Sequence, residues 1–117
     1  MARQYVPDRG DIVWLQFNPQ TGHEQAGHRP ALVVSPRAYN ARVGLALFCP
    51  VTAQVKGYPF EVVLPSGLEA QGAILSDQVK SLDWRERKAK RVCMVPTEIL
   101  EETVALILAL VDPEEAR

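Results

Sequence analysis

Residues 12–34, IVWLQFNPQTGHEQAGHRPALVV, decide how this chain folds. They begin with a largely apolar run, residues 12–17, that is typical of a β-strand, and residues 18–22 (NPQTG) supply the turn residues that end it. Residues 31–34 (ALVV) are a short continuous apolar run bounded by prolines, as expected for a strand buried on both faces. The stretch therefore predicts two strands joined by a polar loop.

The rest of the chain continues this pattern of short apolar runs between turn residues. Further strands are predicted at residues 45–49, 60–64, 72–75, 77–82 and 92–95. About seven short strands indicate a mainly β fold, either a small barrel or a sandwich. Residues 38–41 have the composition of a single helical turn.

A C-terminal helix is the clearest helical signal in the sequence. Pro96 and Thr97 open it, glutamates follow where the helix dipole favours carboxylates, and Asp112 precedes the proline that ends it. Residues 104–111 are apolar all round, which a helix on a barrel surface cannot tolerate if one side faces water. We therefore expect another molecule to cover this helix, and a second copy of the chain is the economical candidate.

Length and composition predict one soluble domain over residues 1–117. Of its residues, 47% are hydrophobic and 23% are charged, which is ordinary for a globular protein. The longest apolar run, residues 104–111, is far shorter than the ~20 residues of a membrane span, and no leader is recognisable, so we expect a cytoplasmic protein without a membrane anchor. Cys49 and Cys93 lie in apolar runs without metal-ligand spacing. We expect buried thiols, no metal and no cofactor.

Charge is unevenly distributed along the chain, although the net charge is only −1. Residues 98–117 carry six acidic side chains against Arg117, so residues 1–97 have a net charge of +4. Five basic residues crowd residues 85–91 beside Trp84. This segment is either a solvated loop or an electrostatic guide for a nucleic-acid backbone, with Trp84 available for stacking.

The loop before the second predicted strand, residues 24–30 (EQAGHRP), brings a carboxylate, an imidazole and a guanidinium together. Pro30 holds Arg29 out of the helical region, so its fork of donors leaves the strand in a defined direction. A surface salt bridge between Glu24 and Arg29 is the simplest explanation of such a pair. The other explanation is a phosphate-handling loop.

Several sequence fragments, taken together, resemble the MazF/PemK family of toxin ribonucleases. They are residues 5–8 (YVPD), 10–14 (GDIVW), 24–30 (EQAGHRP), 50–52 (PVT), 56–64 (KGYPFEVVL) and 77–81 (DQVKS). The fragments occur in the family's order and cover nearly the whole chain. The resemblance implies a small SH3-like barrel with a C-terminal helix, the CcdB/MazF-type toxin fold, and a homodimer.

It also implies a sequence-specific, metal-independent endoribonuclease that cleaves single-stranded RNA. RNA contains its own nucleophile, the ribose 2′-hydroxyl, so catalysis requires a base, a cation for the phosphoryl oxygens and a further donor. Arg29 and Thr52 match the family's catalytic pair, as cation and donor. Glu24 is the candidate base, although some relatives rely on the arginine for proton transfer. His28 has the chemistry of an acid or base near neutral pH, and hydrogen bonding within its loop explains it equally well.

Base recognition in RNA uses hydrogen bonds to unpaired bases and aromatic stacking. The candidate RNA-binding residues are His28, Phe17, Asn40, Lys56, Tyr58, Asp77, Gln78 and Lys80. Of the polar ones, Asp77 and Gln78 stand out because they begin a run that is otherwise read as an apolar strand. For each residue the structural alternative is a capped turn or a satisfied edge-strand group.

The family mode of regulation is a short MazE-like antitoxin whose acidic, disordered C-terminal segment folds onto the toxin dimer and occludes the RNA groove. A basic body suits such a partner. The main alternatives are a non-catalytic protein on the same fold, such as a DNA gyrase poison, and an RNA-binding module without cleavage. Gyrase poisons are not expected to combine Glu24, Arg29 and Thr52, and an intact Arg29 and Thr52 also argue against an inactive toxin homologue.

Overall fold

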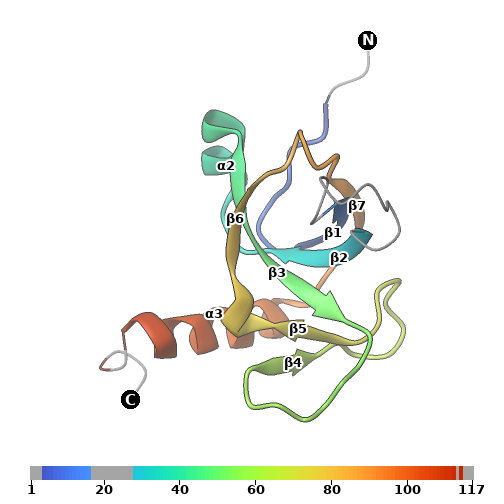
Figure 1. The fold of residues 1–117 in the computed structure, drawn as a ribbon, viewed down its shortest axis with the longest axis vertical. Coiled ribbons are helices and arrows are strands. Elements are labelled where there is room, and N and C mark those ends of the chain that lie inside the picture. The colour runs from blue at the N-terminus through green and yellow to red at the C-terminus, as the bar shows by residue number, and fades with distance from the viewer. Residues whose placement is uncertain (1–3, 17–27, 113, 115–117) are drawn as a thin grey trace.

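The computed structural model describes residues 4–16, 28–112 and 114. These residues form seven strands, two α-helices and one 3-10 turn (Figure 1). The elements are β1 Asp11–Gln16, β2 His28–Val33, α2 Arg37–Val43, β3 Leu45–Thr52, β4 Glu61–Val63, β5 Ala73–Leu75, η1 Ser76–Gln78, β6 Lys80–Asp83, β7 Lys90–Met94 and α3 Thr97–Val111.

All seven strands belong to one antiparallel sheet, in the order β4-β5-β3-β2-β1-β7, and β6 also pairs with β3. β3 is the long central strand that runs through both halves of the sheet (Figure 1). One of its edges pairs with β2, and the other pairs first with β6 and then, near its C-terminal end, with β5. The β4–β5 hairpin thereby lies beside the end of β3, where Thr52 is.

Two cores form on opposite faces of the sheet because successive strand residues point to opposite sides. The first, which we call the inner core, gathers residues of β1, β2 and β3 around the indole ring that follows β6. Its buried members are Val13, Leu15, Ala31, Val33, Ala46, Phe48 and Trp84. The expectation that residues 31–34 are buried on both faces is confirmed, since Ala31, Leu32 and Val33 are all 0% exposed.

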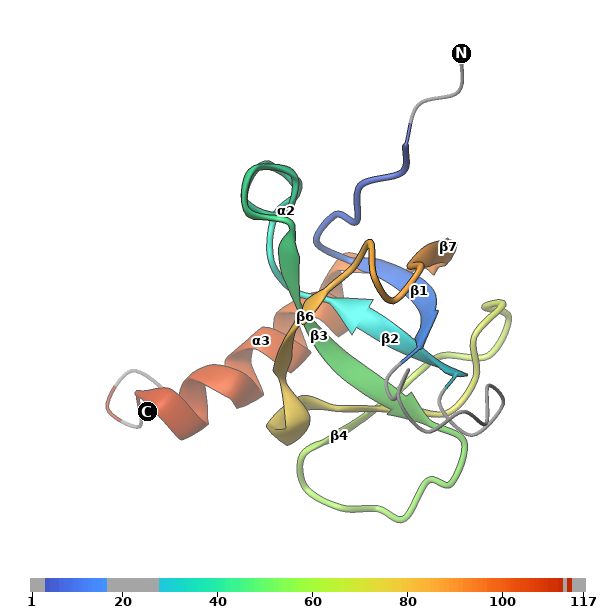
Figure 2. The same cartoon turned by 45° about the horizontal axis from the view of Figure 1, so that its top comes forward.

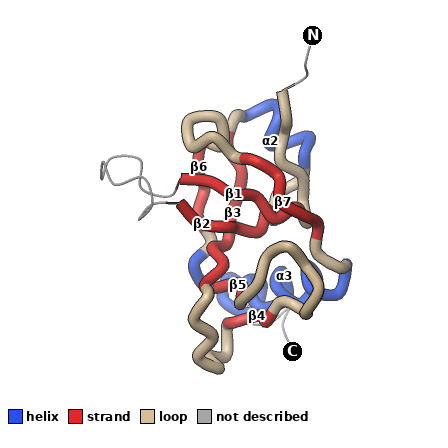
Figure 3. The backbone as a smooth tube through the Cα atoms, turned by 90° about the vertical axis from the view of Figure 1, so that its right-hand side faces the viewer, coloured by secondary structure: helices blue, strands red, loops and turns tan. Residues whose placement is uncertain are grey.

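The second core lies between the sheet and α3. Ile12, Leu32 and Val51 contribute the sheet side of this core, and Leu106 and Ile107 of α3 pack against it. Figure 2 shows α3 crossing beside the sheet, and Figure 3 shows it next to β4 and β5, away from α2. The last turn of α3 is less covered, and Leu110 and Val111 are exposed.

A hydrogen-bonded cluster around Asp11 joins the N-terminal segment to β1 and β7. The buried Asp11 carboxylate accepts hydrogen bonds from the Tyr5 hydroxyl, the backbone N–H of Asp8 and Nε of Arg91, the last at 3.3 Å. Burial and the neighbouring Asp11 raise the pKa of Tyr5 well above its usual value, so its hydroxyl remains a donor. The cluster holds the end of the sheet opposite to the one that carries Arg29.

The mainly β fold with about seven short strands and a C-terminal helix is confirmed. Helix α3 covers Thr97–Val111 as expected, while the single turn expected at residues 38–41 is a two-turn helix, Arg37–Val43. One local prediction is wrong: Asp77 and Gln78 belong to the 3-10 turn between β5 and β6, not to a strand. In the part of the chain that the structure describes, none of the helices is long and apolar enough to cross a membrane.

Candidate functional site

Arg29 and Thr52 are brought together by the pairing of β2 and β3. Ala31 pairs with Pro50, so the antiparallel register brings Arg29, near the start of β2, towards Thr52 at the end of β3. Because strand side chains alternate between faces, both residues project on the same side of the sheet as Ala31. The antiparallel register therefore explains why two residues 23 positions apart in sequence form one site.

A hollow of about 420 Å³ lies at this end of the sheet, and we call it the first hollow. It is lined by His28, Arg29, Pro30, Val51, Thr52, Ala53, Gln54 and Gln71. Arg29 is exposed, and no carboxylate of the described residues forms an ion pair with it. Its guanidinium offers a planar set of donors of the kind that binds phosphate in a bidentate manner.

The Thr52 hydroxyl is oriented by its own loop. Its Oγ1 accepts a hydrogen bond from the backbone N–H of Gln54 at 3.1 Å, which leaves the hydroxyl proton free to be donated elsewhere. The backbone of Gly72 lies directly against Thr52: a Cβ atom at Gly72 would lie 2.0 Å from the Thr52 carbonyl oxygen. Gly72 therefore permits the close approach that fixes Thr52 at the rim.

His28 is held from the neighbouring strand by Trp14. The indole Nε1–H donates a hydrogen bond of 3.0 Å to Nδ1 of His28, and the two rings meet edge to face with centroids 5.7 Å apart. An accepting Nδ1 means that neutral His28 carries its proton on Nε2, the nitrogen still available to a ligand. His28 is thus hydrogen-bonded to a residue of β1 and also lines the first hollow.

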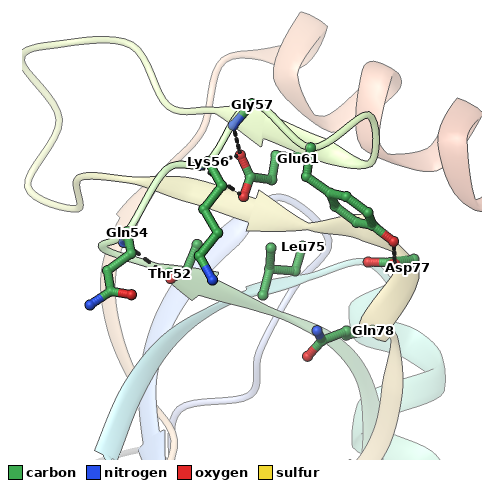
Figure 4. A pocket seen from close by; sticks show the side chains of 9 residues that line it. Thr52, Gln54, Lys56, Gly57, Glu61, Leu75, Asp77 and Gln78 are labelled. Carbon is green, nitrogen blue, oxygen red and sulfur yellow. Dashed lines mark hydrogen bonds between the residues drawn. The ribbon is translucent and has the colours of Figure 1, made fainter.

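A second hollow, of about 440 Å³, continues from the first and shares Thr52 and Gln54 with it. Its lining comes from the end of β3, the loop 53–60, the start of β4 and the β5–η1 corner. The lining residues are Thr52, Gln54, Lys56, Gly57, Tyr58, Glu61, Leu75, Asp77 and Gln78 (Figure 4). Four of the candidate RNA-binding residues therefore meet in one place. They are Lys56, Tyr58, Asp77 and Gln78.

The loop over the second hollow is held at two points. The Glu61 carboxylate accepts hydrogen bonds from the backbone N–H groups of Lys56 and Gly57, at 3.1 and 3.0 Å. The Tyr58 hydroxyl donates to Oδ2 of Asp77 at 2.6 Å, and this bond raises the pKa of Tyr58. The other oxygen of Asp77, Oδ1, is buried and has no hydrogen-bond partner among the described residues.

The prediction that Asn40 contacts RNA is wrong, because its side chain is fully buried at 0% exposure. Its Nδ2 donates to the carbonyl oxygens of Pro7 and Ser35, its Oδ1 accepts from the Ser35 hydroxyl, and its backbone carbonyl accepts from Trp84 Nε1. Every polar group of this amide is used inside the protein. Asn40 is a structural centre of α2 and offers no surface to a base.

Lys80 is exposed at the start of β6, where it pairs with Phe48 in the sheet, and it lines neither hollow. The other two candidates, Glu24 and Phe17, lie outside the described residues.

The basic segment after β6 is used largely for structure. Trp84 is 2% exposed and sits in the inner core, so it is not a stacking platform for bases, and Arg85 lies over its ring with the guanidinium carbon 4.8 Å from the centroid. Arg87 donates to the carbonyl oxygen of Gln16 at 3.0 Å, and Arg91 pairs with Asp11. Three of the five basic side chains thus hold the turn and the strands.

Trp14, Gln54, Glu61 and Gln71 belong to the site but were missed by sequence reasoning. The alternation of the first strand contains a signal for Trp14, because it shares a face with Gln16 rather than with the buried Val13 and Leu15. No comparable signal exists for Gln71, which arrives from a loop. Among the described residues, His, Cys, Asp and Glu side chains form no group of three that could hold a metal ion.

Comparison with known proteins places most of the chain in one family. Residues 8–111 match the family of PemK-like, MazF-like toxins of type II toxin–antitoxin systems. The endoribonuclease toxin MazF of Escherichia coli K12 is 52% identical over 111 residues, which cover 95% of this chain and 99% of that protein.

Solved structures agree. The crystal structure of MazF from Deinococcus radiodurans superimposes with a TM-score of 0.85 at 52% identity, over 92% of this chain and 98% of that one. A chain from a crystal structure of MazE–MazF of the same organism gives a TM-score of 0.85 at 50% identity, over 92% and 97%. The chain therefore belongs to the MazF/PemK family of type II toxin–antitoxin endoribonuclease toxins.

Proposed function

We propose that this endoribonuclease toxin cleaves single-stranded RNA at a specific sequence and without a metal ion, at the first hollow, using Arg29 and Thr52. The observation that carries the proposal is the convergence of these two side chains at one strand end, beside a hollow of about 420 Å³. An exposed guanidinium and an oriented hydroxyl there supply the donors that a phosphodiester needs.

Cleavage then needs no nucleophile from the protein. The ribose 2′-oxygen attacks phosphorus, the bond from phosphorus to the 5′-oxygen breaks, and the products are a 2′,3′-cyclic phosphate and a 5′-hydroxyl. Arg29 holds the phosphoryl oxygens and the Thr52 hydroxyl donates to one of them, so both act where negative charge develops. One proton leaves the 2′-oxygen and one arrives at the 5′-oxygen.

Glu24 is the residue that we assign to the first proton transfer, with Arg29 as the alternative base. A carboxylate accepts the 2′ proton, whereas a guanidinium must first lose one of its own, which is difficult because arginine stays protonated in proteins. The two are separable by experiment: Glu24→Gln keeps the shape and removes the base. A large loss of rate with unchanged RNA binding supports Glu24, and an unchanged rate assigns the proton to Arg29.

The RNA strand crosses both hollows in this proposal. The first hollow holds the scissile phosphate and the second, which shares Thr52 and Gln54 with it, takes an adjoining nucleotide. His28 contacts the strand at the first hollow through Nε2, and Lys56, Tyr58, Asp77 and Gln78 contact it at the second. Lys80 and Phe17 are retained as outlying RNA contacts.

We further propose a homodimer formed through the exposed end of α3. Leu110 and Val111 are 50% and 72% exposed, and an apolar hollow of about 350 Å³ runs from Val111 and Ile107 to Val79 and Leu47. A contiguous apolar surface of this kind favours burial against a partner. Leu110→Glu with Val111→Glu should yield monomers in light scattering at micromolar concentration, and a wild-type protein that is itself monomeric there contradicts the proposal.

The proposed regulator is a MazE-like antitoxin with an acidic, disordered C-terminal segment, acting in the cytoplasm. The relative from Deinococcus radiodurans was crystallised as MazE–MazF, and residues 1–97 of this chain carry a net positive charge that attracts an acidic segment. Such a peptide should block RNA cleavage competitively. Inhibition that does not weaken as RNA concentration rises would argue against a shared surface.

The experiment that tests the proposed function is incubation of the purified protein with a long single-stranded RNA in EDTA, followed by mapping of cut sites and end groups. Cuts at one short motif with cyclic phosphate ends are expected. Intact RNA, with a folded protein verified by circular dichroism, would instead favour a non-catalytic toxin or a binding module.

A further inference from the structure

The Tyr58–Asp77 pair presents hydrogen-bond acceptors on one side of the second hollow. Tyr58 donates its hydroxyl proton to Oδ2 of Asp77 at 2.6 Å. Because a phenol has a single O–H, the Tyr58 oxygen can then only accept from a ligand. Asp77 also contributes only acceptors when ionised, so the pair has no donor left to offer.

Asp77 has unused acceptor capacity. A carboxylate has about four lone-pair sites, and among the described residues the structure gives this one a single hydrogen bond, from Tyr58. Its Oδ1 is buried without a partner among the described residues, which is an unfavourable state for a carboxylate oxygen. A ligand donor that binds this carboxylate therefore gains more than one that meets a group whose hydrogen bonds are already satisfied.

The rest of the lining suits a flat ring. The side chain of Leu75 forms an apolar floor, and Lys56 reaches from the covering loop towards it, so its ammonium faces the same space (Figure 4). Tyr58 stands at the wall as a half-exposed ring, tilted by 52° against Phe60. An apolar floor with an aromatic wall is the usual environment of an unstacked base.

We propose that the second hollow binds a nucleobase with an exocyclic amino group, and that Tyr58 and Asp77 select such a base over uracil. The inference rests on the proposed function, since it assigns the nucleotide next to the scissile phosphate. Adenine, cytosine and guanine each carry an amino donor. Uracil presents carbonyl oxygens on both sides of its one ring N–H, and these face the negative charge of Asp77 unfavourably.

Cleavage of a randomised single-stranded RNA by the wild type, Asp77→Asn and Tyr58→Phe tests the selection. The wild type should show one position beside the cut at which uracil is depleted about tenfold, as expected for the loss of one charged hydrogen bond. Asp77→Asn supplies an amide donor and should remove that depletion, while the base preferences at the other positions around the cut remain unchanged. Tyr58→Phe, at an exposed site, should weaken it by a smaller factor.

Glu86→Gln is the matched control, since it removes a carboxylate from the turn after β6 and should leave all preferences unchanged. Binding to oligouridylate, oligoadenylate and oligocytidylate, measured by fluorescence anisotropy, separates this inference from cleavage. Even if no RNA is cut, the wild type should bind oligouridylate at least about tenfold more weakly than the tighter-binding of oligoadenylate and oligocytidylate. Asp77→Asn should reduce this difference in affinity. Equal binding of all three by the wild type, or an unchanged gap in a folded Asp77→Asn, overturns the selection by Asp77.

Discussion

Two arginine-bearing regions of this protein have opposite uses. Near the start of β2, Arg29 is exposed beside a hollow, and no ion pair links it to a carboxylate of the described residues. In the turn and strand after β6, Arg85 lies over a core tryptophan, Arg87 donates to a backbone carbonyl and Arg91 pairs with a buried aspartate. Residue type and local charge density alone therefore do not predict which arginine is available to bind RNA. The contacts that each guanidinium already makes within the protein decide this.

The largest effect is expected when Arg29 is replaced by alanine and compared with the same replacement of an arginine in the other region. Arg29→Ala should lower the rate of RNA cleavage by at least about 10²–10³-fold, because a donor to the developing charge is lost. Arg85→Ala, the control, should keep the rate within about threefold, since this side chain covers Trp84 and contacts neither hollow. Single-turnover cleavage assays measure both, and a fast Arg29→Ala would refute the assignment of the first hollow.

The second prediction concerns the position of Thr52, the other half of the first hollow. Gly72→Ala places a methyl group 2.0 Å from the Thr52 carbonyl oxygen, so the end of β3 must shift and the rate should fall about 10–100-fold. Gly67→Ala introduces alanine at a similarly positive φ, +97° against +117°, with no atom within 4 Å. It should destabilise the protein without affecting the rate beyond about twofold. Equal rates for the two variants would show that Gly72 does not position Thr52.

A third prediction inverts the comparison, with stability lost and activity kept. Arg91→Ala removes the partner of the buried Asp11, and because Arg91 itself is about half exposed we expect a loss of about 1 kcal/mol in the free energy of unfolding. Cleavage should be unchanged. Urea denaturation gives the stability, with Lys90→Ala on the same strand as the control. A slowed cleavage step with normal stability would place Arg91 among the RNA contacts.

The effect that is smallest near neutral pH, because it develops only in alkaline solution, concerns the buried thiol of Cys49. Burial, and to a lesser degree the charge of Asp77, raises the pKa of Cys49 to about 12. The unfolded chain therefore loses this proton at a lower pH than the folded chain, so the contribution of Cys49 to stability should be constant below about pH 9 and should fall above it. Cys49→Ala should reduce the slope of the unfolding free energy against pH by up to about 1.4 kcal/mol per pH unit between about pH 9 and 12. An identical slope in urea titrations would contradict the raised pKa.

Local patterns predicted most of the fold. Apolar runs between turn residues located the strands, and the proline before Thr97 located the start of α3. The error at Asp77 and Gln78 arose because a 3-10 turn of three residues has no periodicity of its own. The second hollow could still be anticipated in part, since its polar residues stand out against apolar neighbours.

Long-range contacts explain what the sequence did not reveal. Asn40 is buried because the carbonyl of Pro7, 33 residues away, accepts from its amide, and Trp84 is buried because its indole N–H reaches the backbone of Asn40. An exposed and a buried polar residue look alike in a sequence when their partners are this distant. The same limit applies to Trp14, whose bond to His28 depends on the register of β1 and β2.

The most direct test of the claim that the ribose 2′-hydroxyl is the nucleophile removes one hydroxyl group from the substrate. An RNA oligonucleotide containing the mapped cut site is compared with the same oligonucleotide carrying a single 2′-deoxynucleotide immediately 5′ of the scissile phosphate, in EDTA. Loss of cleavage at that bond alone, with the all-ribose RNA cut to a 2′,3′-cyclic phosphate and a 5′-hydroxyl, is the result that the Arg29 and Thr52 site predicts. Continued cleavage of the deoxy-substituted bond would show that the nucleophile comes from elsewhere and would contradict the account.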